Sequence, residues 1–168
     1  MMKYTLALLL VLLCKVSSAQ TDGYHRPAFT LKLFVDSANF YQADIPESTY
    51  FPKEGVVQIF PGETLYIEAD VVGNKLANFK AVPAIINKEK TLTIIFEQDY
   101  EGKVHNQMRL TISNPFAKQL DYMAMMNLMK QRRWVETSVI PVMPGKRSIE
   151  MWPDILTSIA LSDFTLKE

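Results

Sequence analysis

Alternation of apolar and polar side chains at every second residue is the feature that most constrains the fold of this chain. Between Ala28 and Val35 the odd-numbered side chains are apolar, while Thr30 and Lys32 occupy intervening positions. A period of two places the apolar set on one face of a β-strand. Segments rich in β-branched and aromatic residues recur along the chain, at 56–60, 64–72, 79–86, 91–98, 107–113, 134–142, 148–151 and 155–166. We therefore predict a series of short strands.

Turn-forming residues separate these segments. Pro61-Gly62 predicts a hairpin or a sharp corner, because proline presets the first central turn position and glycine accepts a positive φ at the second. A second Pro-Gly pair at Pro144-Gly145 precedes the segment 148–151 in the same way. Gly73-Asn74 and Asn87-Lys88 mark further turns, and residues 99–106 form a polar stretch that we expect to be a loop.

The segment 115–133 carries conflicting signals. It is rich in Ala, Leu, Met, Lys and Gln, and it follows Asn114, so residue propensity and a plausible cap favour a helix. A helical wheel, however, scatters its apolar residues around every side. As a strand, it places Leu120, Tyr122, Ala124 and Met126 on one face and Met123 and Met125 on the other. We favour a hairpin with a turn near 130–133 and keep one short helix as the alternative.

Many short strands without intervening helices predict an all-β fold. We expect a single antiparallel β-sandwich of the immunoglobulin-like type, which spans 20–168 as one domain. The only cysteine is Cys14, so the predicted domain contains no disulfide and no zinc–thiolate site. The architecture alone assigns no function.

The first 19 residues predict a signal peptide. Lys3 precedes an apolar run from Leu6 to Leu13, and the small residues Ser17 and Ala19 suit cleavage before Gln20. The run is too short to span a bilayer as a helix, so we expect no membrane span. The export signal, together with the absence of cysteine from the predicted mature domain, predicts a periplasmic or extracellular protein of bacterial type.

Charge and motifs exclude several classes of function. Basic and acidic residues are equal in number, 18 each, so the chain has no net positive charge to attract nucleic acid. His25 and His105 lack the spacing of metal ligands, and no nucleophile elbow or phosphate loop is present. We accordingly assign no catalytic residue, no metal site and no cofactor.

Carboxylate pairs and clustered methionines provide two weaker alternatives. Residues two apart on a strand face, such as Glu68 and Asp70 or Glu97 and Asp99, are separated by a distance compatible with inverting glycoside hydrolysis. Thioether sulfur is a soft ligand for Cu(I), and four methionines lie within 123–129. Packing of Met123 and Met125 in the core is the simpler interpretation of the second pattern.

Aromatic residues provide the preferred candidate for a binding site. The segment 39–51 shows no strand alternation across its middle, so we interpret it as a long loop. Aromatic faces beside carboxylates on a long loop suit sugar rings or peptide side chains. The candidate ligand-binding residues are Phe40, Tyr41, Tyr50, Phe51 and Trp134.

These observations predict an exported, non-catalytic binding or accessory module of the cell envelope, whose partner is an unidentified protein or glycan. Three alternatives remain. The chain could be an assembly subunit that pairs through its sheet edges, a carbohydrate-binding or carbohydrate-active protein, or a methionine-based copper-binding protein.

Overall fold

The computed structural model describes residues 24–168, and the predicted signal peptide lies outside them. The described residues form eleven strands and no helix. The strands are β1 (Phe29–Phe34), β2 (Phe40–Ile45), β3 (Val57–Ile59), β4 (Glu63–Val72), β5 (Lys75–Val82), β6 (Thr91–Glu101), β7 (Val104–Ser113), β8 (Gln119–Leu128), β9 (Arg133–Thr137), β10 (Arg147–Trp152) and β11 (Leu156–Lys167).

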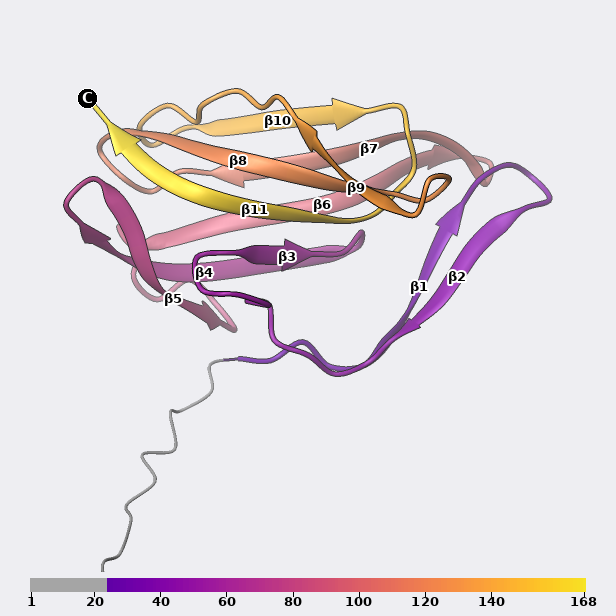
Figure 1. Cartoon of the computed structure of the whole chain (residues 1–168), viewed down its shortest axis with the longest axis horizontal. Coiled ribbons are helices and arrows are strands. Elements are labelled where there is room, and N and C mark those ends of the chain that lie inside the picture. The colour runs from indigo at the N-terminus through magenta and orange to yellow at the C-terminus, as the bar shows by residue number, and fades with distance from the viewer. Residues whose placement is uncertain (1–23) are drawn as a thin grey trace, which may run out of the picture.

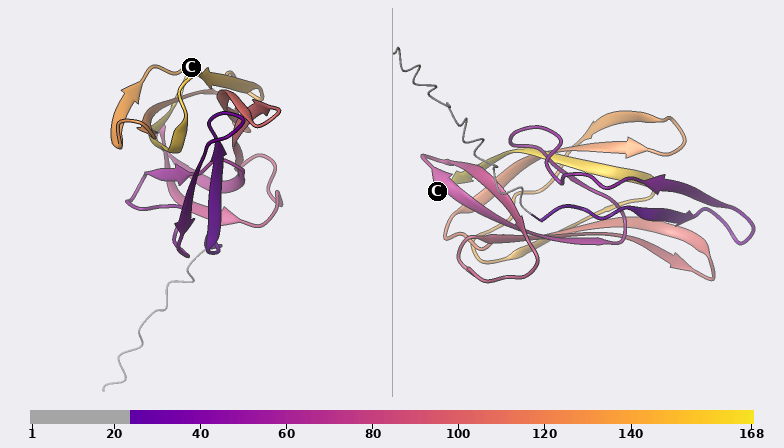
Figure 2. Two further views of the ribbon diagram at one scale, coloured as in Figure 1. Left: turned by 90° about the vertical axis from the view of Figure 1, so that its right-hand side faces the viewer. Right: turned by 90° about the horizontal axis from the view of Figure 1, so that it is seen from below.

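Nine of these strands form one antiparallel sheet in the order β10-β7-β6-β4-β5-β11-β8-β9, in which β3 also pairs with β11. The sheet curls so that its two halves enclose a common interior (Figure 2). Strands β1 and β2 pair only with each other, and this hairpin, which we call the arm (residues 29–45), lies beside one end of the main sheet (Figure 1). The predicted antiparallel all-β class is thus confirmed, and the curled sheet is consistent with a β-sandwich.

The buried interior follows the predicted alternation. On β4, Leu65, Ile67 and Ala69 are buried, whereas Tyr66 and Glu68 lie on the outer face. A separate apolar cluster forms under the arm. Its buried members are Leu31, Leu33 and Ile155, and its partly buried members are Phe29, Val35, Tyr41, Ile45, Phe60 and Met129. The arm is therefore attached to the body by apolar packing along one face of β1.

The segment 115–133 contains β8 and the start of β9, which confirms the hairpin and excludes the short helix. Instead of capping a helix, the buried Asn114 amide donates hydrogen bonds to the carbonyls of Lys118 and Val142, at 2.8 and 2.9 Å. Its Oδ1 accepts a hydrogen bond from the N–H of Phe116. These contacts tie the start of β8 to the chain that approaches β10.

Two predicted loops are wrong. Within 39–51, residues Phe40–Ile45 form β2, whose alternation is masked because both faces of the arm retain exposed or half-exposed side chains. Within 99–106, β6 and β7 extend to a two-residue turn at Gly102 and Lys103, where φ is 54° and 70°. Positive φ at both positions is typical of a tight hairpin turn, and the polar residues belong to an exposed two-stranded ribbon.

Of the two alternatives predicted at Pro61-Gly62, the structure has the corner, because β3 pairs with β11 while β4 pairs with β5 and β6. Two strand ends differ from the predictions. Strand β5 ends at Val82, before Pro83, and β9 ends at Thr137, upstream of Pro141. Proline lacks the N–H that a continuing strand would use in its ladder.

A buried arginine joins the base of the arm to the main sheet. The Arg26 side chain is 1% exposed and donates from Nε to Oε1 of Glu63 at 2.7 Å. Its remaining N–H groups reach the Ser48 hydroxyl and the carbonyls of Thr49 and Gln58. The guanidinium also lies 4.5 and 4.7 Å from the ring centroids of Tyr50 and Phe60, respectively. One side chain thus connects the segments that flank the arm, at residues 26 and 48–49, with β3 and the start of β4.

A buried hydroxyl pair provides a test of the core. The hydroxyls of Tyr122 on β8 and Ser148 on β10 approach each other without the geometry of a hydrogen bond, and each lacks a partner within residues 24–168. Burial, with a contribution from Glu150, raises the pKa of Tyr122. Both effects oppose ionisation of the hydroxyl in the folded protein.

We expect Tyr122→Phe to leave the free energy of unfolding unchanged or to raise it by up to about 1 kcal/mol, because it removes an unsatisfied buried group. The raised pKa also means that the unfolded state loses the Tyr122 proton first, so wild-type stability falls as the pH rises above about 10. The free energy of unfolding of Tyr122→Phe should fall less over the same pH range. Urea unfolding at pH 7 and pH 10.5 measures both effects, with Tyr66→Phe on the outer face as the control. A loss above 1 kcal/mol at pH 7 would show that the hydroxyl is satisfied.

Candidate functional site

A slit opens where β5 and β11 diverge. The two strands pair only at Lys75 and Thr165, and the N–H of Leu166 bonds to the carbonyl of Asn74 nearby. Beyond this point β11 pairs with β3 instead, and the turn 53–56 lies across the gap. The resulting cavity has a volume of about 350 Å³. A neighbouring hollow of about 320 Å³ shares Glu54, Gly55, Leu76 and Phe79 with it.

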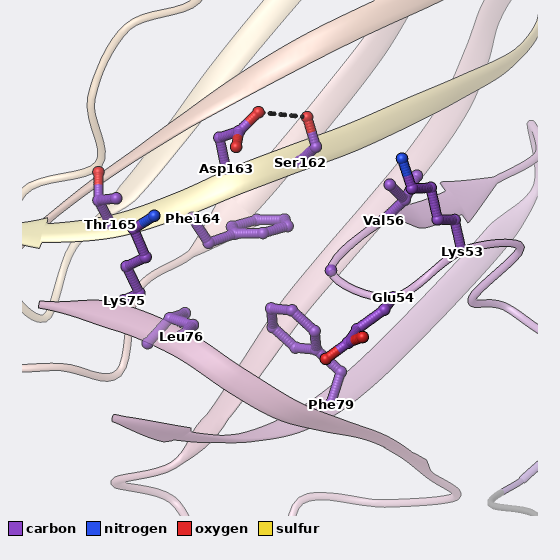
Figure 3. A pocket seen from close by; sticks show the side chains of 11 residues that line it. Lys53, Glu54, Val56, Lys75, Leu76, Phe79, Ser162, Asp163, Phe164 and Thr165 are labelled. Carbon is purple, nitrogen blue, oxygen red and sulfur yellow. Dashed lines mark hydrogen bonds between the residues drawn. The ribbon is translucent and has the colours of Figure 1, made fainter. Parts of the chain in front are cut away.

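Aromatic rings form the floor of the slit and continue into the core. Phe79 of β5 and Phe164 of β11 point toward one another from the two sides (Figure 3), with ring centroids 5.4 Å apart. Phe51 stacks on Phe79 at 6.2 Å, and Tyr122 stacks on Phe164 at 6.1 Å. Because Phe164 is buried and Phe79 is half-buried, Phe79 presents most of the accessible aromatic surface.

Polar and charged side chains surround this floor. Lys53 and Glu54 come from the turn that covers the gap, Lys75 from β5, and Asp163 from β11 (Figure 3). The Asp163 carboxylate accepts a hydrogen bond from the Ser162 hydroxyl at 3.0 Å. Two cations and two carboxylates therefore share the rim, so it favours no strongly charged ligand.

Local backbone geometry creates the opening. Asn78 in β5 and Asp163 in β11 both have a φ of 53°, and the registers of β5 against β4 and of β11 against β8 shift near these residues. Left-handed residues within strands are typical of bulges, which bend a strand and redirect its side chains. Asn and Asp adopt this conformation more readily than other non-glycine residues. The sequence thus encodes the divergence of the two strands at Asn78 and Asp163.

The predicted aromatic site residues do not form one site. Tyr50 is buried and stacks on Tyr24 while its ring contacts Arg26. Phe51 lines the hollow beside the slit and stacks on Phe79, whereas Tyr41 packs in the cluster under the arm. Phe40 is 52% exposed on β2, with the Lys32 ammonium 4.4 Å from its ring centroid, and Trp134 is 42% exposed on the separate strand β9. Of the five residues, Phe51 alone adjoins the slit.

The carboxylate pairs are held by other side chains. Arg109 binds Glu97 and Asp99, each at 3.0 Å. The hydrogen bond from Asn78 and the neighbouring Lys90 lower the pKa of Asp70. A general acid in glycoside hydrolysis needs a raised pKa, so the environment of Asp70 opposes that role.

The clustered methionines point in different directions. Met123 is 42% exposed on the outer face of β8, so core packing does not account for it. Met126 packs against the main core, and Met129 packs in the cluster under the arm. The predicted alternation along β8 is correct, but it separates Met123 and Met126 onto opposite faces of the strand.

A second hollow lies on the outer face of the sheet, with a volume of about 550 Å³. Tyr66, Thr93 and Ser113 lie in one row across neighbouring strands and form part of its floor. Lys88, Lys146 and Arg147 stand around it, all exposed, and no carboxylate belongs to its lining. We call this hollow the basic groove. None of its three cations forms an ion pair with another residue of 24–168.

Sequence reasoning missed most residues of both hollows. Phe79 and Asp163 are 84 positions apart in the chain. The cations of the basic groove come from the connection between β5 and β6, which contains Lys88, and from residues 146–147 at the start of β10. The spacing of residues along the sequence does not indicate contacts between segments so far apart. The Asn78 and Asp163 side chains within apolar strand patterns are the one available signal, because each marks a bulge.

No family model matches the chain, and no curated protein or solved structure is significantly similar to it. In the part of the chain that the structure describes, no three acidic, histidine or cysteine side chains are grouped as a metal site would require. Likewise, residues 24–168 include no helix that could cross a membrane.

Proposed function

We propose that the protein is an exported, non-catalytic binding module whose ligand site is the slit between β5 and β11. The observation that carries this proposal is an accessible aromatic floor on β5 and β11, beneath a ring of hydrogen-bonding side chains from these two strands and from the turn 53–56. Rigid strands on either side hold the two rims in fixed positions, which limits the entropy lost when a ligand binds.

The chemistry of the slit favours a neutral saccharide. A sugar ring has an apolar face that can lie against Phe79 and hydroxyl groups at its edge that can bond to Glu54, Ser162 and Asp163. The balanced charges on the rim provide donors and acceptors without selecting an anion or a cation. This proposal assigns the glycan partner expected from the sequence to a site that only partly overlaps the predicted aromatic set.

An array of neutral oligosaccharides, followed by calorimetric titration of any binder, tests the proposal. Asp163→Asn removes the charge but keeps a residue that tolerates the left-handed backbone. We expect this variant and Glu54→Gln each to weaken binding about tenfold, because each removes a charged hydrogen-bond acceptor. Asp154→Asn, in the exposed connection before β11, is the matched control and should bind like the wild type. Absence of any saccharide binding, or equal affinity in all variants, would contradict the proposal.

The basic groove supports a second candidate function, the binding of an acidic polysaccharide. Three unpaired cations stand around a floor that offers the Tyr66 ring and the Thr93 and Ser113 hydroxyls. Cations without intramolecular partners lose no ion pair when they bind an anion. An extended polyanion can contact several of them at once.

We expect the basic groove to bind polygalacturonate, with an affinity that falls as the salt concentration rises. Lys146→Gln combined with Arg147→Gln should weaken binding at least tenfold. The control is Lys130→Gln combined with Arg133→Gln, which removes the same charge after β8. Equal loss in both double variants would show that binding depends on overall charge and not on the groove.

A further inference from the structure

The tip of the arm contacts β6 through the side chain of Gln98, and it contacts β7 through a backbone hydrogen bond from the N–H of His105 to the carbonyl of Val35, at 3.4 Å. Gln98 accepts a hydrogen bond at Oε1 from the N–H of Phe34, at 2.9 Å, and donates from Nε2 to the carbonyl of Phe34, at 2.8 Å. This amide thus pairs with the backbone of β1 as a neighbouring strand would. The Phe34 ring also contacts Tyr100, with centroids 4.6 Å apart.

The Phe34 backbone fixes the orientation of the Gln98 amide. A backbone N–H can only donate and a backbone carbonyl can only accept, so Oε1 must face the N–H and Nε2 must face the carbonyl. The second proton of Nε2 then points to His105 at the start of β7, where Nε2 of Gln98 and Nδ1 of the imidazole are 3.0 Å apart.

These contacts require one protonation state of His105. Nδ1 must present a lone pair to the Gln98 donor, so the proton of the neutral ring lies on Nε2. Nε2 in turn lies 3.0 Å from the carbonyl of Pro153, which can only accept. The neutral tautomer with the proton on Nε2 therefore satisfies every contact.

We propose that His105 is a pH-sensitive latch that holds the arm tip against β6 and β7 while the imidazole is neutral and releases it on protonation. A protonated ring carries N–H groups on both nitrogens, so Nδ1–H faces the Gln98 NH₂ group and the two donors conflict. Rotating the Gln98 amide removes this conflict but places two donors, and two acceptors, against each other at Phe34. The first outcome breaks the contact that orients the Gln98 amide, and the second breaks both of its hydrogen bonds to Phe34, so protonation weakens the attachment of the arm tip in either case.

The other charged groups around His105 do not offset this effect. Tyr100 lies opposite His105 on β6. Asp36 follows Val35, the arm residue whose carbonyl accepts a hydrogen bond from the backbone of His105, and Asp154 follows Pro153, whose carbonyl faces the ring. Asp36 is engaged by Ala38 and Asn39, and no carboxylate of residues 24–168 is hydrogen-bonded to the imidazole. At the other end of the arm, the Arg26 contacts involve no histidine side chain, so protonation of His105 frees the tip while the base stays attached.

Nitrogen NMR of the histidine rings, combined with amide hydrogen exchange of the full chain, tests the latch. At pH 8 the proton of the His105 ring should reside on Nε2. Protection factors of the arm amides, corrected for intrinsic exchange at each pH, should fall about fivefold between pH 7.5 and pH 5.5, the change expected from the net loss of one hydrogen bond.

His105→Gln should abolish this pH response, and His25→Gln, near the base of the arm, should retain it. A proton on Nδ1 of His105 at pH 8, arm protection that does not change with pH, or a response lost in His25→Gln instead would overturn the proposal. The tautomer measurement uses the wild-type protein, so it tests the latch even if the His105 variant is poorly folded.

Discussion

The burial of Arg26 is the constraint on which the rest of the structure depends. A guanidinium removed from water must be paired and hydrogen-bonded, and Glu63, Ser48 and two carbonyls fulfil that requirement. These partners belong to the segment that follows the arm, to β3 and to the start of β4, while Arg26 itself precedes the arm. The three segments can satisfy the arginine only in their native arrangement, so this one side chain specifies how the arm is placed on the sheet.

The same strands that build the core also form the candidate sites. Left-handed residues at Asn78 and Asp163 bend β5 and β11 apart, and the space between them is floored by the aromatic rings that continue into the core. The slit therefore requires no separate loop insertion. At the opposite end, the arm reaches β6 through Gln98, so the region around His105 can respond to pH without any change in the slit.

The sequence predicted the fold class well because a period of two is a local signal. Alternation alone placed the apolar residues of β1 on one face and separated the two faces of β8, and the hairpin at 115–133 was correct against a helical residue composition. Strand β2 was missed because neither of its own faces is buried, which weakens the alternation. The immunoglobulin-like topology and export remain predictions. The sites were largely missed because their residues meet only through pairings between distant strands, and the buried role of Arg26 carries no pattern at all.

Urea unfolding of Arg26→Met measures how far the buried guanidinium stabilises the fold. Removal of the guanidinium leaves the Glu63 carboxylate and two carbonyls without their partner, so we expect a loss of about 3 to 5 kcal/mol in the free energy of unfolding. Arg109→Met is the control, since its ion pairs with Glu97 and Asp99 are partly exposed, and it should lose no more than about 1 kcal/mol. Equal, small losses in the two variants would contradict the claim that Arg26 organises the fold.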